Sequence, residues 1–197
     1  MGRGPIMNSA QRLVHPLASS VAEIRAAAID ELAACVSRAC AEPSDVMGQQ
    51  IKAALARAAA EPALLAAAHR KPSADCYARH VLYADPAGRF TILSIVWGAG
   101  QFSPPHAHHT WCGYAVHDGD LRETLFSWNP ATSRAEPLRT QARQTGYSCY
   151  ASAGLDQIHR LGNPGARPAI SIHVYGVERD RIATHVNRPV EAALTEG

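Results

Sequence analysis

The chain has 197 residues, which suits one globular domain, or one domain with a helical appendage, and is enough to bury a core without disulfides or a structural metal. Its charges are well mixed, with a formal net charge of +2 and no basic block, so nothing in the composition indicates a nucleic-acid interface. The five cysteines are an odd number and include no CxxC pair, so we expect no disulfide framework.

The sequence shows neither a charged-then-apolar leader nor an apolar run long enough to cross a bilayer. We therefore expect a cytoplasmic protein that needs no membrane.

The first third of the chain has a helical pattern. From about residue 10 to residue 69, apolar residues recur at three- and four-residue intervals, as in Val21, Ile24 and Ala28. Glu42-Pro43 and Glu61-Pro62 interrupt this pattern, which predicts three short helices with breaks near both prolines. We expect residues 1–75 to form a helical segment that packs on the remainder of the chain.

From Cys76 onward the composition changes to β-branched and aromatic residues separated by Gly, Pro, Asn and Asp. Many short strands at fairly even spacing indicate a sandwich or a small barrel, and residues 76–197 are expected to form one structural unit. The predicted strands are residues 78–84, 90–97, 105–109, 113–116, 121–128, 147–151, 158–161 and 169–175.

Three histidines fall within four positions, at 106, 108 and 109. On a strand, His106 and His108 point to the same face, whereas His109 points to the opposite one, where we expect it to face solvent or to pack. Imidazole suits iron, copper, nickel and zinc, so the pair predicts half of a metal site. A later strand histidine should complete the site, and His159 is the best candidate.

At this point the sequence resembles the cupin superfamily. The first cupin motif has the form G(x)5HxH(x)3-4E(x)6G and the second ends in H(x)3N. Gly100, His106, His108 and Gly119 fill the first motif, and His159 and Asn163 fill the end of the second. The resemblance implies a mainly β, jelly-roll barrel behind the helical segment. Cys112 stands where the motif has its glutamate, which would leave three neutral ligands and no carboxylate.

A cysteine at that position is typical of thiol dioxygenases, and further segments resemble the cysteine dioxygenase family. They are Tyr77-Ala78-Arg79, Val96 to Gly100, Gly119 to Thr124, His159 to Pro164 and Ser171 to Tyr175. The resemblance implies that His106, His108 and His159 bind Fe(2+), and that a Ser171-His173-Tyr175 hydrogen-bonded relay faces the metal. It also implies that Arg79, with Tyr77 beside it, holds the substrate carboxylate. A monomer is expected.

Alternatives stay open for several individual residues. Counted forward from His108, the family cysteine that some members crosslink to the tyrosine falls on Cys112 or on Gly113. Cys112 is otherwise an ordinary buried thiol. Arg79 is otherwise a surface cation, and His173 and Tyr175 otherwise pack between sheets.

The resemblance implies oxidation of L-cysteine with O2 to cysteine sulfinic acid, and three neutral ligands would leave the metal open sites for such a thiol substrate. An alternative is a dioxygenase for 3-mercaptopropionate or another carboxylate thiol, whose carboxylate residue would match Thr184 here. An alternative from a different class is a non-catalytic cupin that binds a metal or a small ligand, since a fold does not fix a function.

Overall fold

The computed structural model describes residues 19–193. Helix α1 (Val21–Ala39) begins with a capping box, in which Ser20 Oγ accepts from Glu23 N at 3.2 Å and Glu23 Oε2 accepts from Ser20 N at 2.7 Å. Helix α2 (Ser44–Ala59) follows Pro43. Of the predicted first helix, residues 10–18 lie outside the described range.

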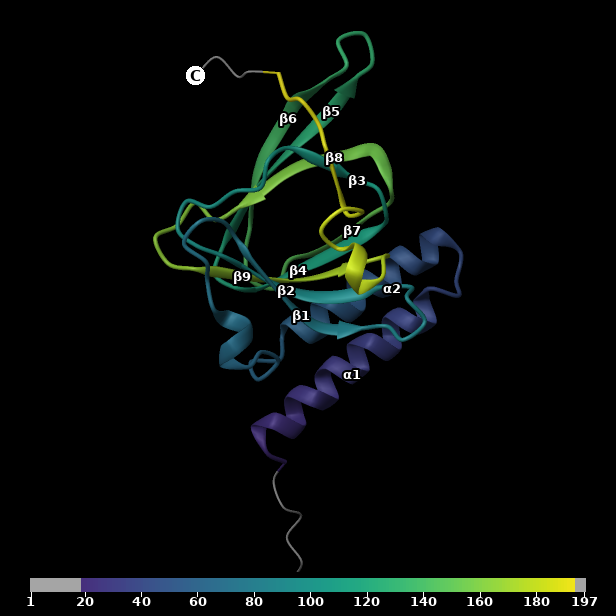
Figure 1. The fold of residues 1–197 in the computed structure, drawn as a ribbon, viewed down its shortest axis with the longest axis vertical. Coiled ribbons are helices and arrows are strands. Elements are labelled where there is room, and N and C mark those ends of the chain that lie inside the picture. The colour runs from purple at the N-terminus through teal and green to yellow at the C-terminus, as the bar shows by residue number, and fades with distance from the viewer. Residues whose placement is uncertain (1–18, 194–197) are drawn as a thin grey trace, which may run out of the picture.

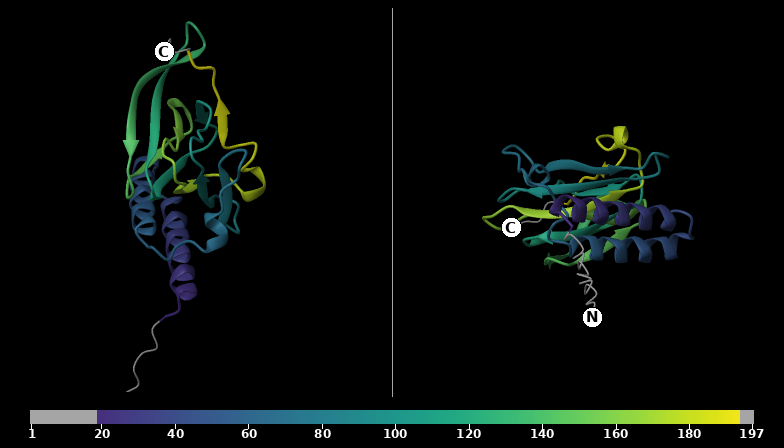
Figure 2. Two further views of the ribbon diagram at one scale, coloured as in Figure 1. Left: turned by 90° about the vertical axis from the view of Figure 1, so that its left-hand side faces the viewer. Right: turned by 90° about the horizontal axis from the view of Figure 1, so that it is seen from below.

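The two helices lie side by side on the outer face of one sheet, as Figures 1 and 2 show. Their buried faces, which include Leu32 and Val36 of α1 and Ile51 and Leu55 of α2, form one apolar core with the outward-facing residues of that sheet. Burial of these aliphatic side chains stabilises the docked pair more than helix propensity does.

The third predicted helix is wrong. Residues 60–66 form turns, and a short 3-10 helix, η1 (Ala67–Arg70), follows them. The Glu61 carboxylate accepts from Ala63 N at 2.7 Å, and Leu64 and Leu65 are drawn into the core. A stretch of this length before Pro72 is too short to sustain an isolated helix.

The remaining chain forms two five-stranded antiparallel sheets that face each other. One has the order β1-β2-β9-β4-β7 and the other β10-β3-β8-β5-β6. The strands are β1 (Ala78–Ala84), β2 (Thr91–Trp97), β3 (His106–His108), β4 (Cys112–Asp118), β5 (Leu121–Asn129), β6 (Arg134–Arg143), β7 (Ser148–Ala151), β8 (Gly154–Gly162), β9 (Ala169–Tyr175) and β10 (Asn187–Pro189), with a 3-10 turn η2 (Arg179–Arg181) before β10. The mainly β, cupin-type jelly roll expected from the sequence is confirmed.

Strands β6 and β10 were not among the predicted strands, and β4 and β8 are longer than predicted. Strand β6 lies at a sheet edge and is largely exposed, so its sequence lacks the apolar alternation that marks a half-buried strand. It contains Pro137, which an edge strand tolerates because one side of it needs no ladder hydrogen bonds. Strand β10 has only three residues and ends in Pro189.

No helix within residues 19–193 combines the length and the apolar character that crossing a bilayer requires.

Candidate metal centre

The three predicted histidines meet inside the barrel. Strand β3 carries His106 and His108 and pairs with β8 so that His106 lies opposite His159. One ring nitrogen from each lies within 4.8 Å of the others, and the three imidazoles are at most 9% exposed. Among residues 19–193 this is the only group of three or more His, Cys, Asp or Glu side chains that converges in this way.

In His106 and His159, a hydrogen bond engages Nδ1 of the ring and leaves Nε2 free. His106 Nδ1 donates to the Pro104 carbonyl at 2.9 Å, and His159 Nδ1 donates to Glu123 Oε1 at 2.7 Å. Their Nε2 atoms therefore keep lone pairs for a metal. Burial, and secondarily the neighbouring His159, lowers the pKa of His106 to about 3 and that of His108 to about 2. Both rings are neutral at pH 7, as ligands must be, so the trio fits a first-row metal ion.

The opposite sheet supplies a polar relay along β9. Alternate residues share a face, so Ser171, His173 and Tyr175 all point into the barrel. His173 Nε2 lies 2.7 Å from Ser171 Oγ, His173 Nδ1 lies 3.0 Å from the Tyr175 hydroxyl, and Trp97 Nε1 donates to Ser171 Oγ at 2.9 Å.

In one assignment of protons, both Ser171 and His173 donate a hydrogen bond within the relay. Ser171 donates to His173 Nε2, and His173 Nδ1–H donates to the Tyr175 oxygen, so the Tyr175 proton is free to point at the cavity. Burial lowers the pKa of His173 well below its ordinary value and raises that of Tyr175, so both groups are neutral.

Arg79 lies on β1, an edge strand of the sheet that contains β9, and Tyr77 directly precedes this strand. Arg79 Nη2 donates to the Tyr77 hydroxyl at 3.2 Å, and the Tyr77 ring packs on Trp97 with centroids 4.6 Å apart. Arg79 Nε is buried and has no hydrogen-bond partner in the described part of the chain. The guanidinium therefore keeps donors in reserve for a carboxylate, the group that an arginine fork fits best.

Cys112, and not Gly113, points into the barrel. Cys112 lies opposite Tyr175 in the β4–β9 pairing, lines the same cavity, and has its Sγ 3.4 Å from His108 Nε2. A Cβ on Gly113 would instead meet Leu55 and Ile51 of helix α2, on the other face of the sheet. Burial raises the pKa of the Cys112 thiol well above its ordinary value.

All nine predicted site residues except Ser171 line one cavity, and Ser171 lies within hydrogen-bond distance of His173, which does line it. The two sheets divide the contributions. The three convergent histidines come from the β10-β3-β8-β5-β6 sheet, whereas Arg79, Cys112 and the relay come from the β1-β2-β9-β4-β7 sheet. Thr184 and the arginines of η2 are exposed and line no part of this cavity.

Several cavity residues were not identified from the sequence. The unpredicted lining residues are Ile95, Trp97, Ser103, Tyr114, Leu161 and Asn187. The most consequential omission lies outside the cavity: Glu123 of β5 joins His159 to Arg143 through its two carboxylate oxygens, each at 2.7 Å. Burial opposes ionisation of Glu123, but the hydrogen bonds from His159 and Arg143 outweigh it and lower its pKa. Its place in the Gly119–Thr124 segment was the only signal in the sequence.

Two residues beside the ligands face away from the cavity. His109 is exposed, as expected. Arg160 is exposed as well, and its guanidinium stacks over the Phe102 ring at 4.7 Å. Among the described residues it forms no ion pair with a carboxylate.

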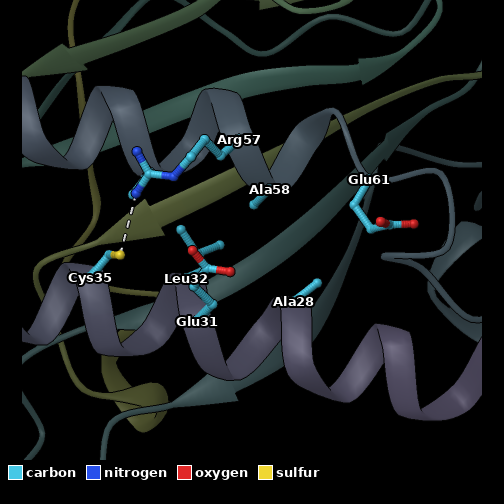
Figure 3. A pocket seen from close by; sticks show the side chains of 8 residues that line it. Ala28, Glu31, Leu32, Cys35, Arg57, Ala58 and Glu61 are labelled. Carbon is cyan, nitrogen blue, oxygen red and sulfur yellow. Dashed lines mark hydrogen bonds between the residues drawn. The ribbon is translucent and has the colours of Figure 1, made fainter. Parts of the chain in front are cut away.

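A second hollow lies between helices α1 and α2, and its lining residues are separate from those of the barrel cavity (Figure 3). Its wall contains Cys35, whose Sγ accepts from Arg57 Nη2 at 3.4 Å, together with Glu31 and Glu61. Neither a histidine nor a set of convergent ligands is among its lining residues, so the chemistry belongs to the barrel cavity.

Comparisons with known proteins find sequence likeness to one family. The family described as "Cysteine dioxygenase type I" matches residues 17–188. The curated protein "Cysteine dioxygenase type 1" of Danio rerio is 32% identical over 92 residues, and its Homo sapiens counterpart is 29% identical over 90 residues. Each match covers 45% of this chain and 45% of the relative, so the chain spans about half the length of the curated relatives it matches.

Among solved structures, the crystal structure of TT1209 from Thermus thermophilus superposes with a TM-score of 0.45 at 16% identity. The superposition covers 56% of this chain and 91% of the other.

Proposed function

Since this chain belongs to the cysteine dioxygenase type I family, we propose that it is an iron-dependent thiol dioxygenase that oxidises L-cysteine with O2 to cysteine sulfinic acid. The observation that carries the proposal is one cavity that joins three convergent histidines, a free arginine donor and a tyrosine hydroxyl. The reaction adds both atoms of O2 to one sulfur, so it needs no external reductant.

Each group has a role that follows from its contacts. His106, His108 and His159 would hold Fe(2+), which when bound would supply the electron transfer that O2 needs before it reacts with a closed-shell thiolate. Arg79 would bind the substrate carboxylate through Nε and a second guanidinium nitrogen. The Tyr175 hydroxyl, kept neutral by burial and held by His173, would donate a hydrogen bond to the reacting groups.

The apolar wall serves the same chemistry. Ile95, Trp97 and Leu161 line the cavity and are at most 2% exposed. They would exclude water from the thiol and strengthen the electrostatic contacts of the substrate. All these residues belong to one chain, which supports activity as a monomer, and we place that activity in the cytoplasm.

The choice of cysteine over 3-mercaptopropionate rests on the arginines. Of the arginines in residues 19–193, only Arg79 lines the cavity, whereas those of η2 are exposed. A non-catalytic cupin is a weaker alternative, because metal storage alone needs neither the buried relay nor an arginine with unsatisfied donors.

The Arg79→Gln substitution tests the substrate assignment. Loss of a charge-assisted carboxylate contact should reduce kcat/KM for cysteine about 10- to 100-fold, mostly through KM. Oxidation of cysteamine, which has no carboxylate, should change little. Steady-state oxygen uptake with cysteine, 3-mercaptopropionate and cysteamine measures all three.

Arg160→Gln is the matched control, because Arg160 is next to the ligand His159 in sequence but lies on the outer face. It should retain the wild-type rates. Undiminished cysteine oxidation by Arg79→Gln, or a higher wild-type kcat/KM for 3-mercaptopropionate than for cysteine, would overturn the assignment of L-cysteine.

A further inference from the structure

We infer that Glu123 and Arg143 form a buried charged pair that positions His159 and strengthens metal binding from outside the ligand set. The inference rests on the proposed function in one respect, namely that the three histidines bind a metal ion. Glu123 touches neither the substrate cavity nor the space between the three rings, so it is a positioning residue.

The pair is built from two neighbouring strands of the metal-binding sheet. Glu123 lies on β5 and is 3% exposed, and the Arg143 side chain comes from the adjacent β6. Glu123 uses Oε1 for His159 Nδ1 and Oε2 for Arg143 Nε. The Arg143 guanidinium in turn stacks on the Tyr147 ring at 4.1 Å. The carboxylate is therefore held on both oxygens and has little freedom to rotate.

This anchoring has two consequences for His159. The acceptor at Nδ1 fixes the tautomer that carries its proton there and leaves Nε2 as the donor atom for a metal. A carboxylate partner also makes the ring a stronger ligand than a neutral acceptor does. His106 has only a backbone carbonyl, and His108 has only the Cys112 thiol beside it at 3.4 Å and 3.6 Å. Within residues 19–193, His159 is the one ring of the three with a charged partner.

Arg143 has a separate role in the pair. A carboxylate buried beside the ligands without a counter-charge would be costly, and the guanidinium removes most of that cost. The pair is neutral overall, so it directs negative potential at His159 without adding net charge to the barrel. In a cupin with a glutamate ligand, the carboxylate binds the metal directly. Here the Glu123 carboxylate would act on the metal only through its hydrogen bond to His159.

The test compares metal affinity with fold stability in three variants. Glu123→Gln should weaken binding of Co(2+), measured by visible absorption titration without thiol, about 10- to 100-fold. Because it leaves the Arg143 charge uncompensated, it should also lower the melting temperature of the metal-free protein. The double variant Glu123→Gln/Arg143→Gln removes that charge and should regain melting temperature while its affinity stays weakened.

Asp85→Asn is the matched control, since Asp85 also forms a buried-carboxylate pair with an arginine at 2.7 Å but lies in the β1–β2 turn. It should lower the melting temperature and leave the Co(2+) affinity and spectrum unchanged. Wild-type affinity in Glu123→Gln, or affinity that recovers together with stability in the double variant, would overturn the inference. Metal binding without thiol oxidation by the wild type would instead count against the proposed function alone.

Discussion

Cys112 shows how much depends on which face of a strand a residue occupies. Cys112 and Gly113 are both candidates for the family cysteine by counting, but a one-residue shift on a strand exchanges the two faces. The β4–β9 pairing places Cys112 beside Tyr175 and turns Gly113 toward helix α2. Cys112 thus lines the cavity without adding charge to it, because burial raises the pKa of its thiol well above the ordinary value.

We expect turnover in air to crosslink Cys112 to Tyr175 in part of the protein. Forming the thioether removes one hydrogen from sulfur and one from the ring, with O2 as the oxidant, so intact-mass spectrometry should show a species lighter by two hydrogens. Cys112→Ser and Tyr175→Phe should both lack it. Cys149→Ser, whose thiol lies opposite Tyr114 on the next strand, should keep it. An unchanged wild-type mass after prolonged turnover would leave Cys112 as an ordinary buried thiol.

The turn between β1 and β2 links the barrel to the helical segment. Asp85 accepts from Arg89 Nε at 2.7 Å and from Arg89 N at 3.1 Å, and Arg89 Nη2 donates to Ser37 Oγ of helix α1 at 2.7 Å. The Asp85 side chain is 4% exposed and that of Arg89 is 43% exposed, so solvent screens part of this attraction.

Asp85→Asn should therefore lower the free energy of unfolding by about 1 kcal/mol at pH 7, measured by urea denaturation. The Arg89 side chain lowers the pKa of Asp85 below its ordinary value of 3.8. A lowered carboxyl pKa stabilises the fold fully above the ordinary value, and this stabilisation is lost as the pH falls through the lowered pKa. The difference in the free energy of unfolding between the wild type and Asp85→Asn should thus be constant from pH 5 to 8 and shrink near pH 3. A difference that grows in acid would contradict this origin.

Elements with a strong local pattern could be predicted from the sequence, and those that depend on distant partners could not. The bounds of β1 and β9 match the predictions, since turn residues flank them and their residues are β-branched or apolar. Strand β6 is polar, so its own sequence does not mark it as a strand, and it is held in the sheet by pairing with β5. Glu123 was missed for a related reason: a lone carboxylate in a strand usually faces solvent, and its partners are 20 and 36 residues away.

The whole molecule divides its chemistry between two facing sheets. The three convergent histidines and the Glu123–Arg143 pair belong to one sheet, whereas Arg79, Cys112 and the β9 relay belong to the other. A resemblance confined to short motifs could predict the two sets of residues because each set has its own motif. How the sets face each other across the cavity depends on non-local strand pairing, which only the folded chain displays.

Oxidation of L-cysteine under 18O2 by the Fe(2+)-loaded protein tests the central proposal most directly. The account predicts cysteine sulfinic acid in which both sulfinate oxygens carry the label, formed with one O2 consumed per cysteine. A folded, iron-loaded sample that consumes no O2 with cysteine, or whose product carries oxygen from water in place of 18O2, would contradict it.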